Sequence, residues 1–170
     1  MAKSPEFSST SSDIEDSPEA VFQFMLEQGW SDGLPAIPPT ADRVRAMLDY
    51  VQRDAGELIG YINPDAGSAT VEKIAVNAVM AGCLPEYMPV LIAAVQAITE
   101  PSFNIHGLQT TTNPASPLLI VNGPVRGLIG LNSGRGTLGP GYRANATIGR
   151  TIRLLLLNVG GAKPWATDMS

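Results

Sequence analysis

One stretch of the chain, VLIAAVQAI at residues 90–98, is apolar on every side if it forms a helix. A helix without a polar face has to be covered all round. We therefore predict a helix that starts at Pro85 or Pro89 and is buried on all sides. Burying such a helix within a single chain of 170 residues is demanding, and this requirement weakly favours a partner chain.

Apolar periodicity and capping residues predict four further helices. Pro18 suits the first position of a helix that follows Ser17, and Thr40 suits a capping position. Positions with the helical period carry most of the large apolar residues in each segment. The four predicted helices run from 18 to 29, from 41 to 51, from 68 to 82 and from 143 to 158.

The hydrophobic period changes in three other segments, which we predict to be strands: residues 56–61, FNIHGLQTTT and PLLIVNGP. The last is a short continuous apolar run of the kind found in a covered sheet. The predicted fold class is α/β or α+β, with a small sheet packed with about five helices. Residues 1–17 are Ser-rich and acidic, so we expect a disordered N-terminal tail before a single globular domain over residues 18–170.

The composition argues against several function classes. The formal net charge is −5, which disfavours a general nucleic-acid binder because phosphate binding requires clustered Lys and Arg. Cys83 is the only cysteine and His106 the only histidine, so the sequence predicts no disulfide framework, and an all-His or Cys/His metal site would require ligands from another chain. No apolar run reaches the roughly 18–20 residues that span a bilayer, and the N-terminus lacks a signal-peptide pattern. We expect a soluble, cytoplasmic protein without membrane contact.

The glycine-rich segment NSGRGTLGPGYRANATIGR, residues 132–150, is the strongest candidate for a binding site. Gly139 and Gly141 permit positive φ and close backbone approach, so consecutive N–H groups can form an anion-binding concavity before a helix N-terminus. Within the helix, Arg143, Thr147 and Arg150 share one face. A carboxylate, phosphate or sulfonate fits this arrangement. The alternative is a connector before a helix whose arginines face solvent or pair with acidic residues.

Two polar residues near this segment have predicted structural roles. Asn145 projects toward the apolar side of the helix, near its first turn. A buried amide requires hydrogen-bond partners, so we expect Asn145 to brace the loop backbone, with direct substrate contact as the alternative. Asp32, in GWSDGLP, is expected to close its own turn.

The candidates for catalysis are Cys83 and His106. Cys83 lies between two predicted helices, and at a helix N-terminus its thiolate would be favoured as a nucleophile. The alternative is that this lone cysteine is a small buried hydrophobic residue. His106 is a candidate general acid or base, with Asn104 on the same face of a strand as a substrate contact. The alternative for His106 is a hydrogen-bonded structural residue.

Four segments together resemble the N-terminal half of the UGSC-type bacterial proteins, over about residues 28–168: GWSDGLPAIPPT, ATVEKIAVNAVMAGCLPEY, LLIVNGP and NSGRGTLGPGYRANATIGR. These proteins are named for selenocysteine or cysteine followed by Gly-Ser-Cys. The resemblance implies a shared fold. The naming motif is absent here, which argues against thiol redox catalysis by this chain alone. Family members continue past the segment matching GGAKPWATDMS, so the resemblance also implies a half-protein whose partner supplies the remainder, or a processed product.

Together these features suggest a subunit of a soluble enzyme that acts on a small anionic organic molecule, with a second protein subunit or as a homo-oligomer. A lyase or hydrolase reaction is favoured because the sequence contains no nucleotide-binding fingerprint, and the cofactor is left unassigned. Two alternatives remain: a structural or regulatory subunit of a hetero-oligomer, and a metabolite-binding module.

Overall fold

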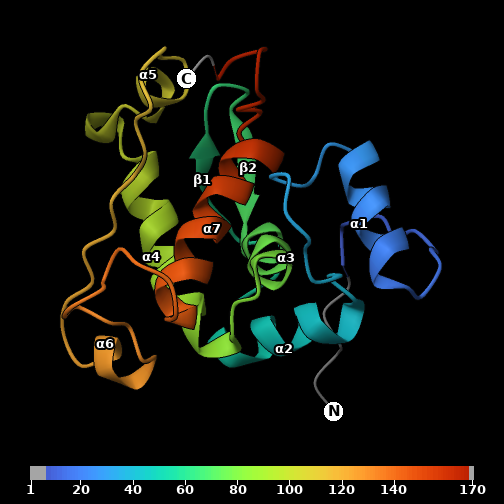
Figure 1. The fold of residues 1–170 in the computed structure, drawn as a ribbon, viewed down its shortest axis with the longest axis horizontal. Helices are drawn as coiled ribbons and strands as arrows, with labels where there is room; N and C mark the ends of the chain where they lie inside the picture. The colour runs from blue at the N-terminus through green and yellow to red at the C-terminus, as the bar shows by residue number, and fades with distance from the viewer. Residues whose placement is uncertain (1–6, 169–170) are drawn as a thin grey trace.

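Helices pack around one another and against a two-stranded antiparallel sheet in the computed structural model, which describes residues 7–168 (Figure 1). The architecture is an α+β fold with a small sheet packed against helices, which is one of the two predicted classes. In chain order the elements are α1 (Pro18–Glu27), α2 (Ala41–Val51), β1 (Leu58–Ile62), β2 (Gly67–Thr70), α3 (Val71–Ala81), α4 (Met88–Thr99), α5 (Ile105–Gln109), α6 (Val125–Leu128) and α7 (Arg143–Asn158).

Helix α3 lies at the centre, where α2, α4 and α7 cover it (Figure 1). All of its residues except Lys73 and Val76 are buried. The Thr70 side chain begins the helix by accepting a hydrogen bond from the N–H of Lys73, and Gly82 ends it in the left-handed conformation at φ 94°. Small side chains such as Ala75 allow the surrounding helices to approach closely.

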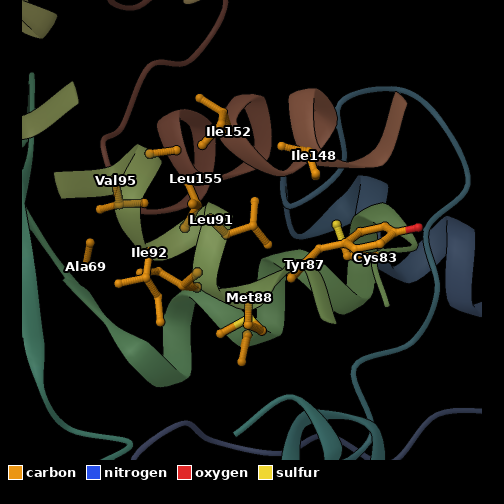
Figure 2. Packing of buried hydrophobic residues seen from close by; sticks show 14 of the residues in the cluster. Ala69, Cys83, Tyr87, Met88, Leu91, Ile92, Val95, Ile148, Ile152 and Leu155 are labelled. Carbon is orange, nitrogen blue, oxygen red and sulfur yellow. The ribbon is translucent and has the colours of Figure 1, made fainter. Parts of the chain in front are cut away.

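Apolar side chains of α4 and α7 fill the space between these two helices (Figure 2). Leu91 and Val95 of α4 and Leu155 of α7 are fully buried there, with Ile152 beside them. Each such side chain contributes about 1.5–3 kcal/mol relative to an exposed one. The core therefore depends on the contact between these helices rather than on the small sheet.

The prediction that the helix over residues 90–98 is buried all round is wrong for this chain. Pro89, Ala93, Gln96 and Ala97 form an exposed stripe along α4. Alanine counts as apolar but carries little surface, so a stripe of small residues is tolerated in water. The helix buried on almost every side is α3 instead, although it carries polar residues.

The sheet is a hairpin in which Tyr61 pairs with Ser68 and Ile62 with Gly67. The strand predicted over residues 56–61 is confirmed as β1, and both of its ends lie within two residues of the predicted ends. The third helix begins at Val71 rather than near Ser68, because residues 67–70 pair with β1. Gly67 has to be a glycine, since a Cβ at this position would lie 1.8 Å from the carbonyl oxygen of Val159.

The other two predicted strands are wrong. FNIHGLQTTT begins at the last residue of the 3-10 turn Pro101–Phe103 and continues into α5. Asn104 at φ 54° caps α5 by accepting a hydrogen bond from the N–H of Gly107. PLLIVNGP forms neither helix nor strand within residues 7–168. A strand requires a neighbour to pair with, and in the described structure β1 and β2 pair with each other.

The predicted tail is partly anchored. Residues 7–17 contain no helix or strand, but Ser8 and Ser9 hydrogen-bond to the buried carboxylate of Glu72 on α3. Residues 1–6 of the predicted tail and 169–170 of the predicted domain lie outside the described residues. Among the helices of the described part, none is long and apolar enough to cross a membrane.

Replacing Glu72 tests this anchor. The residue is 1% exposed and accepts hydrogen bonds of 2.9–3.0 Å from Ser8 and Ser9. Burial alone raises the pKa of Glu72, but the hydrogen bonds from Ser9 and Ser8 outweigh it and leave the pKa below its ordinary value of 4.5. We expect Glu72→Gln to lower the free energy of unfolding by about 1–3 kcal/mol at neutral pH, measured by urea denaturation.

The difference in the free energy of unfolding between the wild type and Glu72→Gln should depend on pH. Because the pKa of Glu72 is lowered in the folded state, its stabilisation is complete above about pH 4.5 and is lost as the pH falls through the folded pKa. The difference between the wild type and Glu72→Gln should therefore shrink in acid. The exposed control Glu86→Gln should change the free energy of unfolding by less than about 0.5 kcal/mol. An undiminished difference at about pH 3 would contradict the account.

Candidate anion site at the start of helix α7

The glycine-rich loop over residues 132–142 is held in shape by Asn145. The Nδ2 group of Asn145 donates to the carbonyl oxygens of Asn132 at 2.9 Å and Thr137 at 3.1 Å. Its Oδ1 accepts from the N–H of Asn132 at 2.9 Å. The prediction that Asn145 braces the loop backbone is confirmed, and its amide is occupied by these three hydrogen bonds.

The two glycines predicted to bind an anion differ in the structure. The N–H of Gly139 donates to the carbonyl oxygen of Gly136 at 2.9 Å and is thus engaged within the loop. Gly141 adopts φ 109° and leads into Tyr142, which begins α7 without a side-chain cap. The N–H groups of the first turn of α7 therefore have no capping side chain, and they carry the positive end of the helix dipole.

Arg143 is the side chain best placed beside this helix end. Its Nε donates to the carbonyl oxygen of Gly82 at 2.9 Å, which ties the start of α7 to the end of α3. The residue is exposed, and it forms no ion pair within residues 7–168. Thr147, one turn further along, donates its hydroxyl to the carbonyl oxygen of Arg143 at 2.8 Å and so faces the helix backbone.

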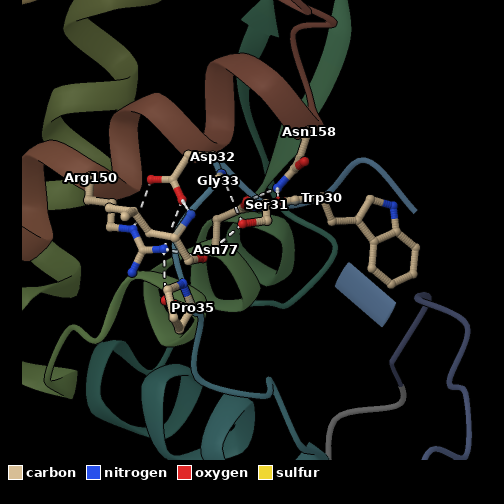
Figure 3. Close-up of polar contacts among 9 residues, drawn as sticks. Trp30, Ser31, Asp32, Gly33, Pro35, Asn77, Arg150 and Asn158 are labelled. Carbon is tan, nitrogen blue, oxygen red and sulfur yellow. Dashed lines mark hydrogen bonds and ion pairs between the residues drawn. The ribbon is translucent and has the colours of Figure 1, made fainter. Parts of the chain in front are cut away.

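Arg150 has a different role from Arg143 (Figure 3). Its Nε and Nη2 donate to the two carboxylate oxygens of Asp32 at 2.9 and 2.8 Å. Nη2 also donates to the carbonyl oxygens of Leu34 and Pro35. Asp32 in turn accepts from the N–H of Leu34 at 3.4 Å, so it also closes its own turn as predicted. This engagement matches the alternative in which an arginine pairs with an acidic residue.

The Asp32–Arg150 pair is largely shielded from water, with side chains 12% and 20% exposed. Burial raises the pKa of Asp32, but the hydrogen bonds and charge of Arg150 outweigh burial and lower it. Asp32 and Arg150 lie 118 residues apart in the chain, so no local sequence pattern identifies them as partners. The pair fixes the loop after α1 against α7.

Cys83 is buried, and its sulfur lies 3.1 Å from the hydroxyl oxygen of Thr151. Burial raises the pKa of the Cys83 thiol, although hydrogen bonding with Thr147 and Thr151 and the charge of Arg143 oppose this effect. A protonated, buried thiol is a poor nucleophile. The geometry favours the alternative in which Cys83 is a small core residue.

His106 and Asn104 are exposed at α5 and its cap, and not on a strand. Helix α5 lies at the end of the molecule opposite the start of α7 (Figure 1). The structure therefore does not bring His106 to Arg143. Within residues 7–168, no three His, Cys, Asp or Glu side chains gather as metal ligands.

The sequence analysis missed a cavity elsewhere in the molecule. A cavity of about 420 Å³ lies between α5, residues 114–119, α7 and residues 164–168. Gln109, Arg153 and Asp168 line it. They come from three segments distant in sequence, so no local motif marks the site.

No protein-family model matches the chain, and neither a curated protein nor a solved structure matches it. The functional argument therefore rests on the geometry of the two sites.

Two aspartates test the structural role of the Arg150 pair. Asp32 forms a shielded, bidentate pair with Arg150, whereas Asp42 forms a pair with Arg45 in which the aspartate is 94% exposed. We expect Asp32→Asn to lower the free energy of unfolding by about 2 kcal/mol and Asp42→Asn by less than about 0.5 kcal/mol. Chemical denaturation of both variants measures this, and equal effects would contradict the assigned role.

Proposed function

We propose that this chain is the anion-binding subunit of an enzyme that acts on a small organic anion. The single observation that carries the proposal is Arg143: its guanidinium is held at the uncapped start of α7 and has no ion-pair partner among the described residues. A helix N-terminus and a neighbouring arginine both favour negative charge. The expected ligand group is a carboxylate, phosphate or sulfonate.

Two contacts support Arg143, rather than Arg150, as the ligand-binding arginine. Arg143 uses only Nε to reach Gly82, and its two terminal nitrogens have no hydrogen-bond partner within residues 7–168. Arg150 uses its Nε and one terminal nitrogen on Asp32, and that nitrogen also contacts two carbonyl oxygens. An anion at Arg150 would compete with a carboxylate already in place.

The reaction we propose is of the lyase or hydrolase type, with the reacting acid or base on a partner chain. The charge of Arg143 acts on the Cys83 thiol, but Cys83 is buried and the pKa of its thiol is raised. His106 lies at the other end of the molecule. Because neither group is available at the anion site, the catalytic groups are assigned to a second subunit or a second copy.

An apolar groove supports the need for a partner. It has a volume of about 530 Å³ and lies between the exposed stripe of α4 and residues 117–122. Leu118 and Ile120 alternate with half-buried neighbours and are 72% and 78% exposed. The backbone N–H groups of Ser116 and of residues 118–122 donate no backbone hydrogen bond within the described structure. An extended, unpaired and apolar segment of this kind suits an added strand from a partner. The resemblance to UGSC-type proteins, which implies such a partner, remains a prediction.

A second candidate function is a regulatory or metabolite-binding subunit without catalysis. It is favoured by the same separation of His106 from Arg143. The two candidates differ in whether the bound ligand is chemically converted. An enzyme subunit, in complex with its partner, converts the ligand. A binding subunit binds the ligand and leaves it unchanged.

The anion site can be tested with inorganic phosphate, acetate and methanesulfonate. Titrated into ¹⁵N-labelled protein, at least one should shift the amide signals of residues 141–145 in a saturable way. Arg143→Gln should weaken this binding about tenfold or more, because it removes a charge-assisted hydrogen bond.

The matched control for this test is Arg43→Gln. Arg43 also donates to a single backbone carbonyl, that of Pro38 at 2.9 Å, but lies on α2. Arg43→Gln should leave the affinity for the three anions unchanged. The proposal fails if the amides of residues 141–145 do not respond to any of the three anions, or if both variants bind as the wild type does.

The partner surface can be tested separately with the double variant Leu118→Lys and Ile120→Lys. Both side chains are exposed, so the isolated chain should keep its thermal unfolding temperature within about 2 °C. Association, followed by native mass spectrometry of protein from its own source, should be lost. A complex that survives both substitutions would contradict the assigned surface.

A further inference from the structure

The cavity between α5 and α7 is the second site that the structure offers. Its volume of about 420 Å³ falls within the range of small-molecule pockets. Its lining combines apolar side chains, among them Ile152 and Leu156, with the polar groups of Gln109, Arg153 and Asp168. Such a mixture of apolar wall and few polar groups is typical of a site for a small organic ligand.

Gly149 keeps this cavity open on the α7 side. It lies inside a helix of 16 residues, where glycine is less favourable than alanine. A Cβ at this position would meet no atom within 4 Å, so packing within the chain does not require a glycine. Gly149 lines the cavity. A side chain at this position would extend into the space that a ligand needs.

Gln109 supplies an unsatisfied polar group at the same cavity. The residue is 5% exposed, and its Oε1 has no hydrogen-bond partner among the described residues. A buried polar atom without a partner is unfavourable, and the last torsion of a glutamine side chain turns readily. Once the amide turns about this torsion so that Oε1 faces the cavity, a ligand N–H or O–H group can satisfy this acceptor.

Two opposite charges, those of Arg153 and Asp168, stand among the described residues that line the cavity. Nη1 of Arg153 lies 3.0 Å from a carboxylate oxygen of Asp168, and both residues line the cavity. A simple anion would be repelled by Asp168 as it is attracted to Arg153, and a simple cation would meet the reverse. An arginine has five N–H donors and a carboxylate has several acceptor positions, so each can bind a ligand group while their ion pair persists.

From these observations we propose that the cavity binds a small zwitterion with an apolar part, the chemistry of an amino acid with an aliphatic side chain. The ligand carboxylate contacts Arg153, its ammonium group contacts Asp168 and the amide oxygen of Gln109, and its side chain packs against the apolar lining. This site is separate from the anion site at Arg143 and does not depend on it.

L-Leucine is the probe for this proposal. Leucinamide lacks the carboxylate, and 4-methylpentanoate lacks the ammonium group, so both serve as matched ligands. At a leucine concentration about 100 times the Kd, the thermal unfolding temperature should rise by about 5–10 °C. Each of the two analogues should bind at least about tenfold more weakly, measured by calorimetry.

Gly149→Leu is the variant that fills the cavity, and Gly127→Leu is its control. Gly127 lies on α6, outside the cavity lining, and a Cβ there also meets no atom within 4 Å. Gly149→Leu should weaken leucine binding at least about tenfold while the helical circular dichroism is kept, and Gly127→Leu should bind as the wild type does. Arg153→Gln, which removes the charge without filling the cavity, should also weaken binding about tenfold.

Three results would overturn the proposal. The first is a wild-type chain whose unfolding temperature and calorimetric signal do not respond to leucine. The second is equal leucine affinity in Gly149→Leu and Gly127→Leu. The third is binding of leucinamide or 4-methylpentanoate as tight as that of leucine, which would remove the assignment to a zwitterion.

Discussion

The packing of α7 over the buried helix α3 determines where every other part of the molecule lies. Apolar contacts supply most of the free energy, and polar contacts fix the register of the two helices. Near the end of α7, Asn158 donates to Oδ1 of Asn77 at 2.8 Å and to the carbonyl oxygen of Trp30 at 3.1 Å (Figure 3). At its start, Arg143 donates to Gly82. Hydrogen bonds of this kind form in only one arrangement of the two helices, so they favour a unique packing.

This packing separates the roles of the polar residues along α7. At its start, the exposed Arg143 contacts the carbonyl oxygen of Gly82 at the end of α3. Its middle is bound to the loop after α1 through the pair between Arg150 and Asp32. On either side of Arg150 along the helix, Gly149 and Arg153 border the cavity beside α5. One helix thus contributes the proposed anion site, a structural ion pair and the wall of a pocket.

The sequence predicted the features that depend on local chemistry. Pro18 and Gly82 mark helix ends, and Asn145 was correctly expected to brace the loop, because these effects act within a few residues. The errors concern partners distant in sequence. The segments around His106 and Leu118 were predicted to be strands, yet the part of the chain that the structure describes holds no neighbouring strand to pair with them. For the same reason, the sequence did not predict that Asp32 pairs with Arg150. It also did not predict the cavity, because its lining forms only when α5 and α7 come together.

The central claim is that two arginines on one helix have different roles: Arg143 binds anions, and Arg150 is held by Asp32. Side-chain ¹⁵N spectra of the arginine Nε–H groups during a phosphate titration test this directly. The account predicts a saturable shift of the Arg143 signal while the Arg150 signal stays in place, since its guanidinium is already paired. A shift of the Arg150 signal, or no shift of the Arg143 signal, would contradict it.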